Sequence, residues 1–184
     1  MEIKKVNRCV KIQLPNGNVV DILSPVMEEM FKWIQDDALR PEGGGYIVGY
    51  QHEKTGNISL EAVSRPYALD TKNRIHFDIR DPQHDVFLRK ARRHKSYYMG
   101  VWHTHPQSDP SPSSVDWDDW NATLQTDTTG SQYIFFIIAG TDNWRIWIGE
   151  IGTGKITEGA ECLTNTDGIY LREGETNEKN SRLY

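Results

Sequence analysis

Residues 100–117 read GVWHTHPQSDPSPSSVDW, and they predict how the rest of the chain is arranged. The apolar residues at and just before the start of this stretch indicate a buried strand. Residues two apart in a strand point to the same face, so we expect His103 and His105 to project side by side. A loop rich in proline and serine follows, and Ser113 then opens a predicted helix whose first turn carries Asp116.

These side chains form a candidate metal site. Two imidazoles from a strand end and one carboxylate from a helix start, with a fourth position left to water, are typical of a catalytic zinc site. Each half also has a simpler interpretation, because His103 and His105 could be an ordinary hydrogen-bonded pair, and Ser113 with Asp116 matches a capping box. The interpretations are compatible, since Ser113 can cap the helix while Asp116 turns to the metal.

The same spacing points to a known family. His103-x-His105, then seven residues, Ser113, two residues and Asp116 resemble the JAMM motif of the JAB/MPN metalloprotease family. The amino-acid sequence of this stretch is similar in particular to that of prokaryotic JAB peptidases. The resemblance implies that His103, His105 and Asp116 hold one Zn²⁺ per chain. It also implies that the Ser113 hydroxyl stabilises the oxyanion of the reaction.

A second family signature lies upstream, where residues 41–49 read PEGGGYIVG. It is similar to the family's glutamate before a glycine-containing strand, which implies that Glu42 is the catalytic general base. A glycine-rich turn can hold phosphate only when a helix follows it, and here a strand follows, so nucleotide binding is not expected. The resemblance covers about residues 25–150. It implies the MPN/JAB fold, a mixed α/β (α+β) architecture with a curved mixed sheet flanked by helices, cytidine-deaminase-like.

The resemblance also implies a reaction and a substrate. The chain is similar to the deconjugating peptidase of CBASS antiphage systems. This implies an isopeptidase that cuts after the C-terminus of a conjugated protein, namely a cGAS-like nucleotidyltransferase attached to its targets. The alternative is a processing peptidase for a ubiquitin-like or sulfur-carrier precursor. A non-catalytic MPN scaffold is disfavoured, because family scaffolds usually lack at least one of the metal ligands that this chain keeps.

Composition limits the class of protein. The chain has 184 residues and a formal net charge of −5, enough length for one domain with a sizeable core. Its densest basic run, residues 89–95, is interpreted as a solvated helix face, so a nucleic-acid partner is not expected. Cys9 and Cys162 are far apart and are interpreted as free thiols in a reducing cytoplasm. No apolar run is long enough to span a membrane, so we expect a cytoplasmic protein without a membrane partner.

Local signals predict the remaining elements. Asn16-Gly17 indicates a hairpin, and Ser24-Pro25 indicates a helix running to about Asp36 with Ser24 as its cap. The histidines at 76, 84 and 94 have no spacing partner and are interpreted as ordinary polar residues. Strands are expected at 9–14, 18–23, 46–50, 58–64, 74–79, 132–139 and 144–149, and a helix at about 81–94.

The composition becomes polar and glycine-rich beyond Glu150. Residues 1–150 are therefore expected to form the JAB/MPN metalloprotease domain. Residues 151–184 are expected to form a polar C-terminal extension of it, with short strands at 155–157 and 169–171 and a frayed end.

Overall fold

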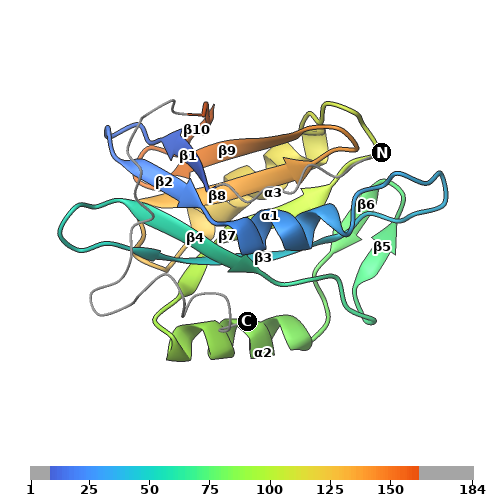
Figure 1. Ribbon diagram of the computed structural model, residues 1–184, viewed down its shortest axis with the longest axis horizontal. Coiled ribbons are helices and arrows are strands. Elements are labelled where there is room, and N and C mark those ends of the chain that lie inside the picture. Colours follow the sequence, from blue (N-terminus) through green and yellow to red (C-terminus); the bar gives the residue numbers. More distant parts are fainter. Residues whose placement is uncertain (1–8, 162–184) are drawn as a thin grey trace.

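The computed structural model describes residues 9–161 (Figure 1). The predicted strand at 169–171 and Cys162 lie outside these residues. The elements in chain order are β1 (Val10–Gln13), β2 (Val19–Ile22), α1 (Ser24–Phe31), β3 (Gly44–Gln51), β4 (Ile58–Val63), β5 (Thr71–Asn73), β6 (His76–Asp78), α2 (Gln83–Arg93), β7 (Tyr97–Thr104), α3 (Ser114–Thr126), β8 (Tyr133–Ala139), β9 (Trp144–Glu150) and β10 (Lys155–Glu158).

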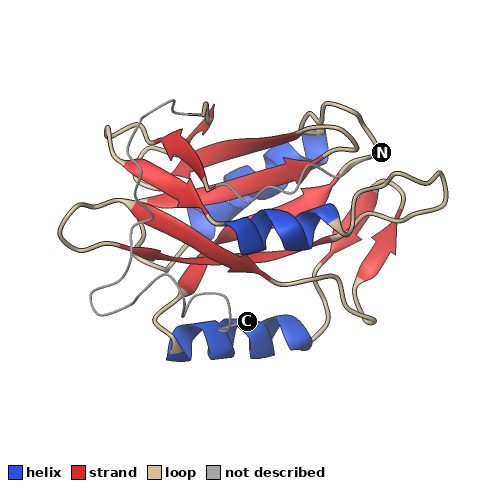
Figure 2. Cartoon of the chain, in the orientation of Figure 1, coloured by secondary structure: helices blue, strands red, loops and turns tan. Residues whose placement is uncertain are grey.

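Eight of these strands form one sheet in the order β1-β2-β4-β3-β7-β8-β9-β10. β2 pairs with β4 and β7 pairs with β8 in parallel, whereas the other neighbours are antiparallel. An isolated bridge from Ile12 to Glu161 brings the segment after β10 against β1, so the two edges of the sheet meet and the sheet curls (Figure 2). The predicted fold class, a curved mixed sheet flanked by helices, is confirmed.

The helices cover both faces of the sheet. α1 packs on one face, where Val26, Met27 and Met30 are fully buried in the main core. On the opposite face, Trp120 of α3 packs over β8 and β9, and Ala91 of α2 packs against β3 and β4. Every residue of β8 is buried, because both faces of this strand are covered, and this explains its uninterrupted apolar sequence.

The start and end of α1 differ from the prediction. Ser24 is the first residue of the helix and not its cap; Leu23 occupies the cap position and makes no side-chain cap bond. The backbone N–H of Leu23 still donates to the carbonyl of Leu60, 3.0 Å away, so the chain passes from the sheet directly into the helix. The helix ends at Phe31 and not near Asp36, because an irregular turn begins at Lys32.

The predicted strand at 74–79 is in fact part of a hairpin. β5 and β6 form a separate two-stranded sheet, with Asn73 paired to His76. The side chain of Asn73 accepts a hydrogen bond from the N–H of Ile75, 2.9 Å away, and such an Asx turn reverses the chain where we expected a strand to begin.

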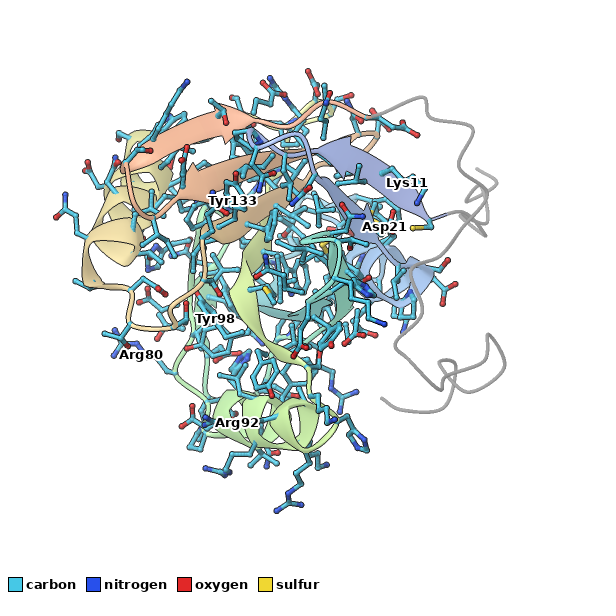
Figure 3. The ribbon with its side chains drawn as sticks, turned by 90° about the vertical axis from the view of Figure 1, so that its left-hand side faces the viewer. Lys11, Asp21, Arg80, Arg92, Tyr98 and Tyr133 are labelled. Atoms are coloured by element: carbon cyan, nitrogen blue, oxygen red, sulfur yellow. The ribbon has the colours of Figure 1, made fainter. Side chains whose placement is uncertain are left out.

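The β1–β2 pair at the edge of the sheet carries a partly buried ion pair. Lys11 and Asp21 lie opposite one another (Figure 3), with Lys11 Nζ 2.7 Å from Asp21 Oδ1. Cys9 has a free thiol, as predicted. Burial, helped by the charge of Asp21, raises the pKa of this thiol to about 12, so it stays protonated and unreactive at neutral pH.

β10 pairs with β9 in the same sheet, which places residues 155–158 within the fold. The division of the chain at residue 150 stays a prediction. Among residues 9–161, no helix is both long and apolar enough to cross a membrane.

Candidate metal centre

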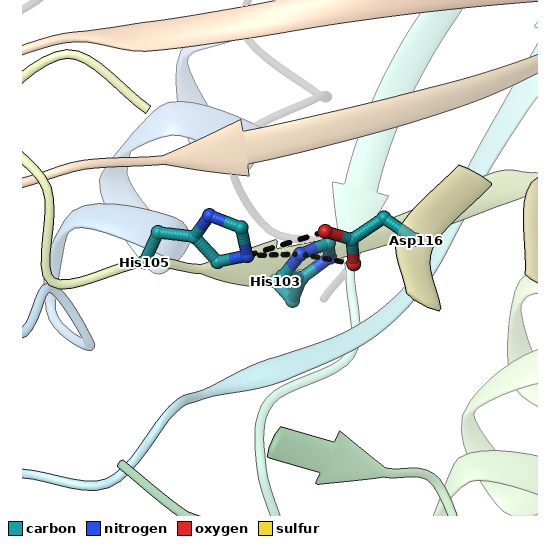
Figure 4. Close-up of side chains that lie close together, drawn as sticks. All are labelled: His103, His105 and Asp116. Atoms are coloured by element: carbon teal, nitrogen blue, oxygen red, sulfur yellow. Dashed lines mark hydrogen bonds and ion pairs between the residues drawn. The ribbon is translucent and has the colours of Figure 1, made fainter. Parts of the chain in front are cut away.

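The end of β7 and the start of α3 bring three side chains together (Figure 4). His103 Nε2 lies 3.0 Å from His105 Nε2 and 3.1 Å from Asp116 Oδ1. His105 Nε2 lies 3.5 Å from Asp116 Oδ2. The two rings share one face because they are two residues apart on an extended chain, and the His105 N–H continues the ladder by donating to Ala139, 2.9 Å away.

The separations of these atoms, 3.0, 3.1 and 3.5 Å, are within a few tenths of an ångström of those around a metal ion. Ligands of a tetrahedral zinc lie about 2.0–2.2 Å from it, and therefore about 3.3–3.6 Å from one another. The three side chains offer two imidazole nitrogens and one carboxylate oxygen, all within 4.8 Å of one another. This donor set suits zinc, so His103, His105 and Asp116 could hold such an ion.

The surroundings of His105 and Asp116 favour the forms of these two side chains that bind metal. Burial, followed by the charge of His103, lowers the pKa of His105, which favours the neutral imidazole. Burial alone would raise the pKa of Asp116. Hydrogen bonds from His103 and Ser113, and the charge of His103, outweigh burial and hold that pKa well below its ordinary value. Neutral histidines and an ionised aspartate are the states that metal binding requires.

The capping box that the sequence predicted is present. Ser113 Oγ accepts from the N–H of Asp116, 3.2 Å away, and the N–H of Ser113 donates to Asp116 Oδ2, 2.6 Å away. The Ser113 hydroxyl also donates to Asp116 Oδ2, at 2.7 Å. The cap therefore fixes the carboxylate whose other oxygen, Oδ1, meets His103.

Glu42 lies at the edge of the same group. Its carboxylate is 5% exposed, and Oε1 is 3.9 Å from His105 Nε2. This is farther than any separation between the three candidate ligands, so Glu42 stands beside the group and not within it. Burial raises the pKa of Glu42 to about 7, an increase that the charge of His103 opposes and the charge of Asp116 reinforces.

The glycines after Glu42 let β3 approach its neighbours closely. A methyl group on Gly44 would lie 2.6 Å from the ring of Phe77 and 2.8 Å from the carbonyl oxygen of Trp102. Gly44 pairs with His103, so this approach holds Glu42 near the histidines. This packing agrees with the expectation that these glycines allow close approach of the backbone.

A buried side-chain network holds the backbone after Glu42. The N–H of Gly43 donates to Thr104 Oγ1, 2.9 Å away, and the Thr104 hydroxyl donates to Gln35 Oε1, 3.2 Å away. Thr104 lies between His103 and His105 in the chain. Its bond to Gly43 therefore connects the backbone beside Glu42 to the backbone of the two histidines. Sequence reasoning missed Thr104 and Gln35. The only signal for Thr104 was its place in the His-x-His motif.

The β5–β6 hairpin also reaches this centre. The N–H of Glu42 donates to the carbonyl of Asn73, 2.8 Å away. On β6, His76 Nε2 lies 3.1 Å from Asp78 Oδ2, and the charge of His76 lowers the pKa of Glu42. Sequence reasoning gave no role to this hairpin, because β5 is polar and exposed, β6 is only half-buried, and neither strand carries a motif.

Fold and site together define an α/β protein with a candidate metal centre at one end of a curled mixed sheet. Residues 24–148 match the family described as prokaryotic homologs of the JAB domain. The match spans well over half of the 184 residues, and the chain belongs to this family.

Three curated relatives carry the name CD-NTase/cGAS isopeptidase. The chain is 29% identical to one from Vibrio cholerae over 132 residues, which cover 68% of this chain and 80% of the relative. It is 26% identical to one from Escherichia coli over 137 residues, covering 72% of this chain and 82% of the relative. A third, from Pseudomonas aeruginosa, is 26% identical over 109 residues, covering 58% and 68%.

A solved structure shares the fold. The solution structure of a protein from Desulfitobacterium hafniense matches with a TM-score of 0.51 at 20% identity, covering 74% of this chain and 87% of that one. At this identity the likeness concerns the fold alone.

Proposed function

We propose that the protein is a zinc-dependent isopeptidase that hydrolyses the amide bond after the C-terminus of a conjugated protein. The observation that carries this proposal is the position of Glu42, with a buried carboxylate 3.9 Å from a group of two histidines and an aspartate. A base beside a candidate metal site is the arrangement that metal-assisted amide hydrolysis needs. Membership of the JAB family supports the same chemistry.

His103, His105 and Asp116 would hold the zinc, which supplies an acidified water and polarises the scissile carbonyl when bound. Glu42 would take the proton of the attacking water on Oε1 and deliver it to the nitrogen of the leaving amine. Burial raises the pKa of Glu42 above that of an ordinary carboxyl, which makes it a stronger base for the first half of this transfer, and the charge of a bound zinc would act in the opposite direction. Burial of Glu42 would keep bulk water from competing for that proton.

Ser113 would donate its hydroxyl to the oxyanion that forms on the substrate. That proton is shared with Asp116 Oδ2 at 2.7 Å in the structure. The hydroxyl would therefore turn from Asp116 to the substrate during the reaction. The cap bond from the Asp116 N–H to Ser113 Oγ can persist while it turns, because that bond uses a lone pair of the oxygen.

We infer the substrate from the relatives. Three of them are named CD-NTase/cGAS isopeptidases, so a cGAS-like nucleotidyltransferase conjugated through its C-terminus to other proteins is the proposed substrate. With this substrate, the protein would act at the deconjugation step of a CBASS-type antiphage system in the cytoplasm.

The test is cleavage of a defined conjugate. A nucleotidyltransferase from the same genome is fused through its C-terminal residue to a reporter, and release of the reporter is followed with and without a chelator. We expect cleavage at the junction, loss of cleavage on chelation and recovery on adding zinc. Cleavage that survives chelation would contradict a metal-dependent reaction. Cleavage only of a sulfur-carrier or ubiquitin-like precursor would contradict the proposed substrate.

A further inference from the structure

A series of hydrogen bonds joins three buried polar side chains between the sheet and the loop before β5. The proposed chemistry uses none of the three. Ser64 Oγ lies 2.8 Å from His84 Nδ1, and His84 Nε2 lies 2.9 Å from Asp70 Oδ2. Ser64 and His84 are each 1% exposed and Asp70 is 7% exposed. The order Ser-His-Asp occurs in nucleophilic catalysis, but a hydroxyl this deeply buried cannot reach a substrate.

The hydrogen bonds assign the protons in this chain. Ser64 Oγ accepts from the N–H of Tyr46 on β3, 2.8 Å away, which leaves the hydroxyl proton for His84 Nδ1. Asp70 can only accept, so His84 carries its own proton on Nε2 and donates it to the carboxylate. His84 therefore connects the sheet to Asp70, with a partner for each nitrogen of its ring.

Asp70 closes the base of the β5–β6 hairpin. Its two oxygens accept from the backbone N–H groups of Tyr67, Arg80 and Asp81, at 2.7, 2.9 and 2.9 Å. Tyr67 comes before the hairpin, whereas Arg80 and Asp81 come after it. One carboxylate thus joins the two ends of the segment, and His84 attaches that carboxylate to the sheet.

Aromatic packing supports the same connection. The His84 ring makes edge contacts with Tyr67 of the loop and Tyr46 of β3, with ring centroids 4.8 and 5.5 Å away. His84 therefore lies between the two parts of the molecule that it connects.

The hairpin in turn holds Glu42. The carbonyl of Asn73 accepts the N–H of Glu42, 2.8 Å away, and the carbonyl of the next residue, Arg74, accepts from Gln35 Nε2, also 2.8 Å away. Gln35 is bonded to Thr104, between the candidate ligands. A shift of the hairpin would therefore be transmitted to the backbone of Glu42.

We propose that His84 is a positioning residue for Glu42, and that it acts through Asp70 and the β5–β6 hairpin. The inference rests on the proposed function of Glu42 as the general base. It has a consequence that can be tested. Loss of the hydrogen bond from His84 to Asp70 should lower turnover more than loss of the hydrogen bond from His84 to Ser64.

Two substitutions of His84 separate these bonds. The amide of a His84→Gln variant reaches as far as Nε2 and can still donate to Asp70, whereas the shorter amide of His84→Asn reaches only as far as Nδ1 and can bond only Ser64. Both variants lose the ring, so loss of packing is common to both. Val20→Ala, at a fully buried position on β2, is the control for a general loss of core packing.

The measurements are amide hydrogen exchange at Glu42, zinc content and cleavage rate, on the same preparations. We expect exchange at Glu42 to be fastest in His84→Asn, and its turnover to fall about 10- to 100-fold through misplacement of the base. Its zinc content and KM should stay close to those of the parent. His84→Gln should retain more of both the protection and the turnover, and Val20→Ala should keep its turnover.

Equal exchange at Glu42 in His84→Asn and Val20→Ala would overturn the proposal, as would equal turnover in the two His84 variants. If the parent protein cleaves no conjugate, the proposed function fails, but the exchange comparison still decides whether His84 positions Glu42.

Discussion

Glu42 is a buried acid whose ionisation opposes folding. Its pKa in the folded protein is raised to about 7 from 4.5, chiefly by burial, so the folded state binds more protons than the unfolded state between these two values. The free energy of unfolding should therefore fall as the pH rises through this range, and the full penalty should be present above pH 7.

Glu42→Gln should remove that penalty. In chelator-treated protein, the variant and the parent should be similar in stability below pH 4.5, and the variant should be more stable by about 3 kcal/mol above pH 7. Denaturant unfolding at a series of pH values measures the difference. A difference that does not change with pH would show that Glu42 ionises as freely in the folded protein as in the unfolded chain. Bound zinc should reduce the difference, because its charge favours the ionised carboxylate.

Ser113 has one observed role and one proposed role, and a single substitution separates them. Ser113→Ala removes the cap of α3 and should cost about 1 kcal/mol of stability. It also removes the proposed oxyanion donor and should lower turnover about 100- to 1,000-fold. Thermal unfolding and single-turnover cleavage on one preparation measure both. A variant that melts earlier but turns over at the parent rate would leave Ser113 with the cap alone.

At the scale of residues, the sequence predicted what short spacings control. His103 and His105 share a face because of strand periodicity, and Ser113 caps α3 because the capping box is a local pattern. His84 was interpreted as an ordinary polar residue, and the structure shows it buried and bonded at both ring nitrogens. Its partners, Ser64 and Asp70, are 20 and 14 positions away, and no periodicity connects residues so far apart.

Among the elements, β3 and β7 set the geometry of the centre, and Gly44 of β3 packs against Phe77 of the hairpin. A side chain there would meet both the Phe77 ring and the carbonyl of Trp102, so Gly44→Ala should destabilise the protein by about 1–3 kcal/mol through overpacking. It should also lower cleavage, because the strand would move away from His103.

Gly152→Ala is the matched control for this substitution, since a methyl group there has nothing within 4 Å. Its unfolding midpoint should stay close to that of the parent. If the two glycine variants unfold at the same denaturant concentration, the close approach at Gly44 does not constrain the fold.

Helices and strands were predicted correctly where the sequence periodicity is strong. Prediction failed where tertiary contacts determine where an element begins or ends. β8 was predicted from its apolar run, and α3 from its cap. The end of α1 was predicted too late, because Gln35 leaves the helical path and its side chain bonds the backbone of Arg40 and Arg74. β5 was missed because its three residues are all polar and exposed, so that no pattern distinguishes them from a loop.

In the molecule as a whole, the centre depends on the order of strands in the sheet. β3 lies beside β7, which brings Glu42 to His103 and His105 although they are about sixty positions apart in the chain. Residue spacing could not predict that β3 pairs with β7, because no local sequence pattern determines the order of strands in a sheet. Only the resemblance to the JAB/MPN family placed Glu42 at the site in advance.

The central claim is that three residues hold zinc and a fourth, Glu42, transfers the proton. The most direct measurement is zinc content and cleavage rate on the same preparations of the parent, Glu42→Gln and Asp116→Ala. The parent should contain about one zinc per chain, and Asp116→Ala should lose most of it. Glu42→Gln should keep its zinc and cleave about 100- to 10,000-fold more slowly. Full zinc in Asp116→Ala, loss of zinc from Glu42→Gln, or cleavage by Glu42→Gln at the parent rate would contradict the claim.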